Sequence, residues 1–109
     1  MGRNYQDYHV PKGVVNIVRA VCCDYYRRRM MISQREVQGA VLNEYTRLNG
    51  AIDGALVSIE EVLRDAILSN VTDGVGYDKS FAACIICKNS FYNRRNKFVH
   101  DVAVALNFM

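Results

Sequence analysis

The C-terminal segment gathers the side chains best suited to contact DNA. Arginine can bond a guanine edge and asparagine an adenine edge through paired hydrogen bonds, and basic side chains also contact phosphates. The candidate DNA-binding residues are Lys88, Asn89, Ser90, Tyr92, Asn93, Arg94, Arg95, Asn96 and Lys97. Their type and density indicate a surface for double-stranded DNA.

Two short helices are expected to position these side chains. The first is predicted from Lys79 to about Cys87, and the second is capped by Asn89 and runs to the C-terminus. The apolar face of the second helix comprises Phe91, Phe98, Val102, Ala105 and Leu106. Two helices joined by a tight turn, the second basic near its start, are typical of a helix-turn-helix. The alternative is a terminal amphipathic helix that closes a bundle and carries a basic face.

An earlier helix is predicted after Pro11, a residue that suits a first helical turn. Apolar residues follow at spacings of three and four, which is a helical stripe. They are Val14, Ile17, Val18, Val21, Cys22 and Tyr25. Arg27, Arg28 and Arg29 would then lie in the last turn, where cations interact favourably with the helix end. They could also add contacts to phosphate.

A longer helix is predicted to start at a capping box in residues 33–36. Its apolar positions alternate steps of four and three, which is a heptad seam. They are Val41, Tyr45, Leu48, Ile52, Ala55, Ile59, Val62 and Ala66. We expect one long helix, with a break near residues 49–54 as the alternative because glycines occur there. The seam would pack on the first helix or, in a homodimer through residues 41–66, on a second copy of the chain.

These patterns predict an all-α fold, a helical hairpin or bundle in a single domain of 109 residues. Residues 1–68 would form the hairpin, with an N-terminal arm over residues 1–10. Residues 78–109 would form the helix-turn-helix part after a loop at residues 69–78. No segment reaches 18 consecutive apolar residues and no signal-peptide core begins the chain, so a cytoplasmic location is expected.

Charge is distributed unevenly along the chain. Residues 1–32 carry a formal charge of +4, residues 33–78 carry −5 and residues 79–109 carry +4. The basic ends favour an anionic partner. The acidic middle supports a second hypothesis, in which carboxylates imitate phosphates in the nucleic-acid groove of a host defence nuclease. Those carboxylates belong to Glu44, Asp53, Glu60, Glu61 and Asp65. A third hypothesis is a structural helical adaptor that oligomerises through the seam.

The C-terminal stretch CKNSFYNRRNKFVHDVAVALNFM resembles the end of the ArpU family of phage late-transcription regulators. The shared features are a serine or threonine, Phe-Tyr, an arginine pair, Lys-Phe and an apolar tail. Upstream, YHVPKGVVNIVRAVCCDYYRRR and NEYTRLNGAID are also similar to phage proteins of this group. The resemblance implies DNA binding through Ser90 to Lys97 and a role in switching on late phage genes in a host cell.

Other chemistry is weakly indicated. Cys84 and Cys87 form a CxxC, and with the adjacent pair Cys22 and Cys23 they could supply four zinc ligands. Adjacent cysteines ligate one metal poorly, so we expect these residues to be buried as small apolar side chains. The two histidines have no nucleophile that the sequence places near them. We therefore expect no enzyme, no metal and no cofactor.

Overall fold

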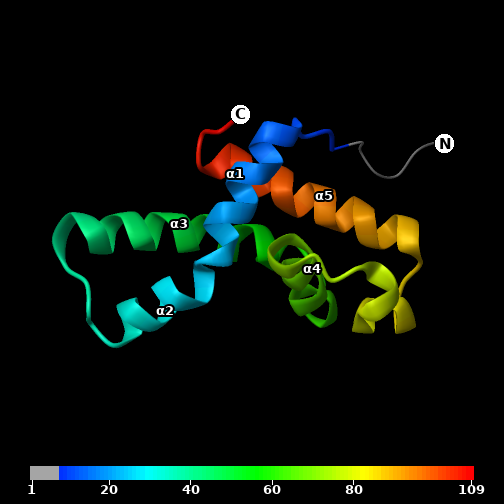
Figure 1. Cartoon of the computed structure of the whole chain (residues 1–109), viewed down its shortest axis with the longest axis horizontal. Helices are drawn as coiled ribbons and strands as arrows, with labels where there is room; N and C mark the ends of the chain where they lie inside the picture. The colour runs from blue at the N-terminus through cyan, green and yellow to red at the C-terminus, as the bar shows by residue number, and fades with distance from the viewer. Residues whose placement is uncertain (1–7) are drawn as a thin grey trace.

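The computed structural model describes residues 8–109, and these form an all-α fold without a β-strand. The N-terminal arm expected over residues 1–10 therefore lies outside the described residues except for its last three. The helices are α1 (Lys12–Cys23), α2 (Tyr25–Ser33), α3 (Gly39–Val57), α4 (Glu61–Asp73) and α5 (Lys88–Ala105). Two single 3₁₀ turns, η1 (Tyr77–Lys79) and η2 (Phe81–Cys84), lie between α4 and α5. Figure 1 shows their arrangement.

The expected first helix is split at Asp24 into α1 and α2, which run in different directions (Figure 1). Val18, Cys22 and Tyr25 from the predicted stripe are buried, but Ile17 is half exposed. The arginine run was predicted to end a helix, and this is wrong because it occupies the first turns of α2. Cations are unfavourable at a helix start, and the Asp24 carboxylate offsets this by pairing with Arg27 at 2.6 Å.

The predicted capping box at residues 33–36 is also wrong. Ser33 is the last residue of α2, so its hydroxyl cannot cap a helix that starts beside it. The chain leaves α2 through Arg35, which adopts a left-handed φ of 57°, and α3 starts only at Gly39. A backbone hydrogen bond from Glu36 N to Met31 O, 2.9 Å long, closes this exit.

The predicted long helix is interrupted, although not at residues 49–54, which lie within α3. The interruption is at residues 58–60, where α3 ends and α4 begins. Ser58 donates its hydroxyl to Ala55 O (2.9 Å), a local bond that competes with helix continuation. Arg64 donates to Ile59 O (2.9 Å) and so satisfies a carbonyl at the corner. Ile59 itself enters the core at 2% exposure.

The corner divides the predicted seam. Its middle members Ile52, Ala55 and Ile59 are buried within the chain, whereas Val41 and Val62 are half or more exposed. Because the buried part is already covered by other helices of the same chain, the seam as a whole is not free to pair with a second copy. A homodimer through residues 41–66 would have to use the outer side of α3.

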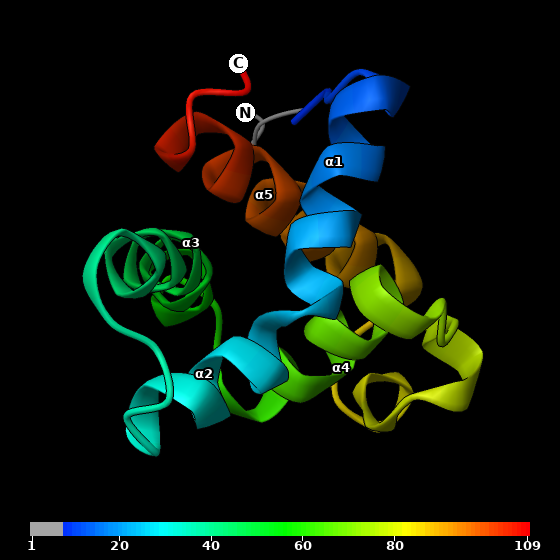
Figure 2. The same ribbon diagram turned by 60° about the vertical axis from the view of Figure 1, so that its left-hand side comes forward.

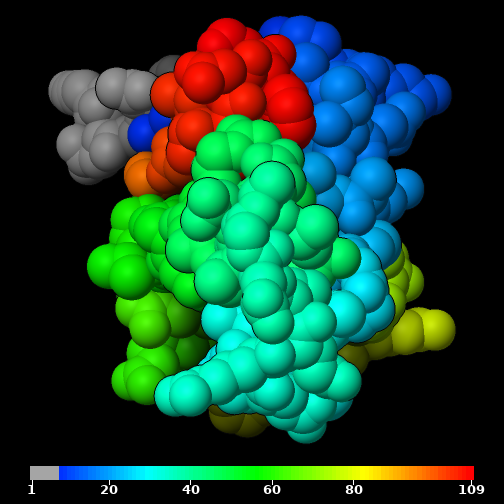
Figure 3. All heavy atoms as spheres, turned by 90° about the vertical axis from the view of Figure 1, so that its left-hand side faces the viewer, coloured from blue at the N-terminus to red at the C-terminus, as the bar shows by residue number. Residues whose placement is uncertain are grey.

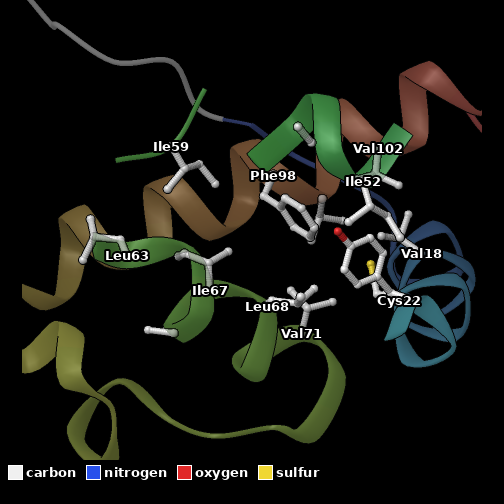
Figure 4. Close-up of a cluster of buried hydrophobic side chains, with 14 of the residues drawn as sticks. Val18, Cys22, Ile52, Ile59, Leu63, Ile67, Leu68, Val71, Phe98 and Val102 are labelled. Carbon is white, nitrogen blue, oxygen red and sulfur yellow. The ribbon is translucent and has the colours of Figure 1, made fainter. Parts of the chain in front are cut away.

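The central element of the fold is α5, which packs against α1, α3 and α4 (Figure 2). Phe91 and Phe98 are fully buried, together with Val99 and Val102. Figure 4 shows side chains of α1, α3, α4 and α5 pointing into this common core. Burying an aromatic side chain contributes about 1.5–3 kcal/mol relative to leaving it exposed, so the α5 phenylalanines are major contributors to folding.

The segment before α5 differs from the expected helix over Lys79 to Cys87. It contains only the two 3₁₀ turns, and Cys87 rather than Asn89 stands at the N-cap of α5. The loop predicted over residues 69–78 is shorter, since α4 continues to Asp73 and ends at Gly74 with φ 70°. Glycine adopts this left-handed conformation without steric cost. The helix-turn-helix geometry expected for residues 78–109 therefore lacks a regular first helix.

The α2–α3 hairpin projects from the body as an arm (Figure 1), and its end faces the viewer in Figure 3. A buried polar network fixes its base. Arg28, 3% exposed, donates to Asn49 Oδ1 (2.7 Å) and to Val21 O (2.6 Å), while Asn49 Nδ2 donates to Tyr25 O (3.1 Å). A buried charge is costly unless it is hydrogen-bonded, so this network holds the two helices in register.

Replacing Asn49 with leucine should destabilise the protein by about 2–4 kcal/mol, because it leaves the Arg28 guanidinium buried without its amide partner. Urea unfolding followed by circular dichroism measures the change. Asn43→Leu, at an exposed position of the same helix, is the control and should stay within about 0.5 kcal/mol of wild type. Equal stability of the two variants would show that the network does not hold the hairpin.

Candidate functional site

Most of the basic side chains of α5 form hydrogen bonds or ion pairs with other groups of the protein. The Arg94 guanidinium forms a bidentate pair with Glu60, with Nε to Oε1 at 2.8 Å and Nη2 to Oε2 at 2.6 Å. Lys97 Nζ contacts Asp101 Oδ2 at 2.6 Å and Ser58 Oγ at 3.1 Å. Arg95 Nε donates to Asn70 Oδ1 at 3.2 Å. Three of the four predicted phosphate-binding cations thus have partners on α4, on the α3–α4 corner or on α5.

The nine predicted DNA-binding residues differ in their exposure. Lys88 and Asn89 are exposed in the first turn of α5, and Ser90 is half-buried beside them. The remaining six, from Tyr92 to Lys97, are all half-buried. The reason is that α1, α3 and α4 contact α5 from several sides. The nine residues are close in sequence, but they do not form one exposed surface.

The Glu60–Arg94 pair links the α3–α4 corner to α5. The hydrogen bonds from Arg94 lower the pKa of the Glu60 carboxyl to about 2. The Glu60 side chain is 50% exposed and that of Arg94 33% exposed, so water screens the attraction. The pair therefore contributes modestly to stability, and it holds the α3–α4 corner against α5.

The predicted acidic residues are only partly free. Glu44 pairs with Arg47 at 2.9 Å, Asp53 accepts a hydrogen bond from the Tyr25 hydroxyl, and Glu60 is taken by Arg94. Glu61 and Asp65 remain exposed, with no ion pair to any residue in 8–109. They lie one helical turn apart, so both carboxylates project from the same side of α4.

Apolar side chains lie beside these carboxylates. Val62, between them in sequence, is 60% exposed, and Phe81 of η2 is 68% exposed. A groove of about 260 Å³ runs between α4 and the 3₁₀ turns, and its walls include Asp65, Phe81 and one basic residue, Lys79. We call Glu61, Val62, Asp65 and Phe81 the acidic face. The sequence patterns did not indicate Phe81 and placed Val62 in the heptad seam. The exposure of these two side chains depends on the corner at residues 58–60 and on the short turns before α5, which the local patterns did not predict.

A larger groove, about 590 Å³, lies in the arm between α2 and α3. Its lining combines apolar and polar side chains, including Tyr25, Arg29 and Asp53. Burial and the bond to Asp53 raise the pKa of Tyr25 to about 12, so this hydroxyl stays protonated. The groove holds no pair of groups arranged for proton transfer to a substrate, since its carboxylate is occupied by the tyrosine.

The cysteines do not gather at one place. Cys22 is buried, and burial raises the pKa of its thiol to about 12, which fits an apolar packing role. The expectation that the CxxC would be buried is wrong, since Cys84 and Cys87 are exposed on the turns before α5. Within the described part of the chain, no three potential metal ligands cluster. No helix there is long and apolar enough to span a membrane.

Comparisons with protein-family models, with curated proteins and with solved structures found no significant match. The resemblance of the C-terminal segment to ArpU-type regulators therefore stays a prediction.

Replacing Glu60 with glutamine should make the unfolding free energy depend less on pH in the acid range. The lowered carboxyl pKa means that the pair stabilises the fold above about pH 4.5 and is lost as pH falls toward about 2. We expect wild type to exceed the variant by about 1 kcal/mol or less at pH 7, the usual range for a screened pair. The difference should vanish at the acid end.

Unfolding free energies measured by denaturant titration at several pH values test this. Arg94→Gln should remove the same pH dependence, since it deletes the other half of the pair. Profiles of Glu60→Gln and wild type that run parallel from pH 7 to the acid limit would contradict the assignment.

Proposed function

We propose that the protein is a non-enzymatic helical module that binds a basic segment of a partner protein through the acidic face. The observation that carries the proposal is the contrast between two surfaces. Glu61 and Asp65 are exposed and without an ion pair in residues 8–109, whereas Arg94 and Lys97 are paired within the fold. The exposed and unpaired charge that Glu61 and Asp65 give this side of α4 is therefore negative.

The acidic face combines the two contributions that binding needs. Exposed carboxylates attract a basic partner and speed its association, an effect that salt screens. Charge at an exposed rim adds little affinity, so an apolar anchor is required. Phe81, 68% exposed beside the α4 groove, supplies such an anchor. A partner segment with lysines or arginines around an apolar side chain would match both.

A basic groove that normally binds nucleic acid is the kind of partner surface that this proposal favours. Carboxylates one turn apart would occupy sites that otherwise hold phosphates, as an inhibitor of a host defence nuclease would do. Glu44, Asp53 and Glu60 contribute less to such mimicry, because each is held by a neighbour of the same chain. The proposal therefore assigns the phosphate mimicry to Glu61 and Asp65, whose carboxylates are exposed.

DNA binding is the second candidate, and one observation favours it. Lys88 and Asn89 are exposed in the first turn of α5, and a helix N-terminus attracts phosphate through its free N–H groups and its dipole. This would be a smaller contact than a reading helix in the major groove. A phosphate contact at this place would agree with the DNA binding and the role in phage transcription that the sequence resemblance implies.

Reversing Glu61 and Asp65 to lysine should weaken binding of a basic partner at least tenfold, which corresponds to about 1.4 kcal/mol. The probe is a labelled amphipathic helical peptide of lysine and leucine, followed by fluorescence anisotropy. Affinity of the wild type should fall with added salt. The double variant Glu36→Lys with Glu44→Lys makes the same net charge change at other exposed positions and should bind within about threefold of wild type.

The same assay with a DNA duplex at about 50 mM salt separates the two candidates. If the protein binds a basic partner through the acidic face, the duplex does not bind. Duplex binding that survives reversal of Glu61 and Asp65 but is lost in Lys88→Ala with Asn89→Ala would overturn it and support the second. Phe81→Ala should weaken peptide binding without changing its salt dependence.

A further inference from the structure

A small cavity lies where the start of the described chain meets α5, away from the acidic face. Its volume is about 170 Å³. Figure 1 shows the first described residues passing next to α1 and α5. The cavity is lined by Tyr8, His9, Val10, Val15, Arg95, Asn96 and Val99. Pockets that enclose a drug-sized ligand measure roughly 300–1,000 Å³, so this one suits a small group.

The charge of Arg95 in this wall is not balanced by a carboxylate of residues 8–109. Its two hydrogen bonds go to neutral amide oxygens, from Nε to Asn70 Oδ1 and from Nη1 to Asn96 Oδ1, each 3.2 Å long. The side chain is half-buried. A guanidinium has five donor hydrogens, so most of its donors remain for a ligand. A charge partly removed from water is costly until an anion meets it.

A second arginine, Arg19 of α1, lies near Arg95 but does not line the cavity. Arg19 Nε donates to Val71 O at 3.2 Å, and Val71 follows the Asn70 that Arg95 contacts. Both arginines therefore donate to the last turns of α4, Arg19 to a backbone carbonyl and Arg95 to a side-chain amide. Burial, and then the charge of Arg19, lower the pKa of Arg95, as expected for like charges close together. Neither arginine forms an ion pair with a carboxylate of residues 8–109, although the C-terminus of α4 and its last residue Asp73 bring some negative charge to this region.

We propose that this cavity binds a phosphate group, held by Arg95 and Asn96 of α5 in its wall, with Arg19 of α1 adding positive charge nearby. The planar guanidinium matches phosphate oxygens in bidentate geometry, and the bonds are strong because both partners are charged. Asn96 adds a donor, since its oxygen accepts from Arg95 and its amide nitrogen faces no acceptor in residues 8–109. The occupant is inorganic phosphate or the phosphate group of a monoester whose other atoms stay outside the cavity, because the volume is too small to enclose a whole nucleotide.

Isothermal titration calorimetry of the full chain tests the site. Inorganic phosphate and adenosine monophosphate are titrated separately, with chloride at equal ionic strength as the reference. We expect saturable binding of phosphate. Binding of the monophosphate at equal strength identifies the phosphate group alone as the ligand, and tighter binding identifies a monoester.

Arg95→Gln should weaken phosphate binding at least tenfold, and Arg19→Gln should weaken it about threefold through the loss of a nearby positive charge. Arg19 is exposed, so its replacement tests the site without threatening the fold if the half-buried Arg95 variant is unstable. Arg47→Gln, which removes an exposed arginine of α3, is the matched control and should bind as wild type does. Unchanged affinity in Arg19→Gln would overturn the proposal.

Asp7, next to the cavity residue Tyr8 in sequence, provides a further check. If the carboxylate of Asp7 were the native occupant, phosphate would bind only to Asp7→Asn, and that result would also overturn the proposal. Equal phosphate affinity of wild type and Asp7→Asn supports a site that is open to an external anion.

Discussion

The burial of α5 between α1, α3 and α4 is the constraint on which the rest of the structure depends. Phe91 and Phe98 lie at zero exposure and tie the three neighbours together. A helix contacted from several sides has little surface left for water, so its polar side chains need partners inside the protein. Arg94 and Lys97 find them in Glu60 and Asp101. Every side-chain nitrogen or oxygen that is fully buried in the described residues has a hydrogen-bond partner.

The corner at residues 58–60 follows from the same constraint. A continuous helix through this region would carry α4 away from α5. The turn instead places Ile59 in the core and brings Glu60 to Arg94. The turn also decides which carboxylates are exposed. By rotating α4 relative to α3, it uses Glu60 internally and leaves Glu61 and Asp65 outside, which creates the acidic face.

The acidic face and the cavity beside Arg95 lie on different elements and have opposite charge. The face belongs to α4 and η2, and the cavity to the chain start and α5. The arm formed by α2 and α3 is a third exposed feature, and at its end Met30 and Val41 are 58% and 50% exposed. These three features lie around one small core in a chain of 109 residues.

The sequence alone determined the helical class and much of the core. Periodic apolar residues such as Val18, Ile52 and Phe98 are buried as the 3.6-residue repeat requires, because that repeat depends only on local helix geometry. Local patterns could not place the helix ends at Asp24 and at residues 58–60. Those ends depend on hydrogen bonds and on core space supplied by residues far along the chain.

The tertiary structure alone decided which charged side chains face a partner. Arg94 and Glu60 are 34 positions apart, and nothing in either local pattern indicates that they pair. The sequence shows that α5 is basic, but it cannot show that three helices surround it. Exposure is a property of the whole packed chain, so the free carboxylates of α4 and the uncompensated arginines beside α5 became visible only once every helix was in place.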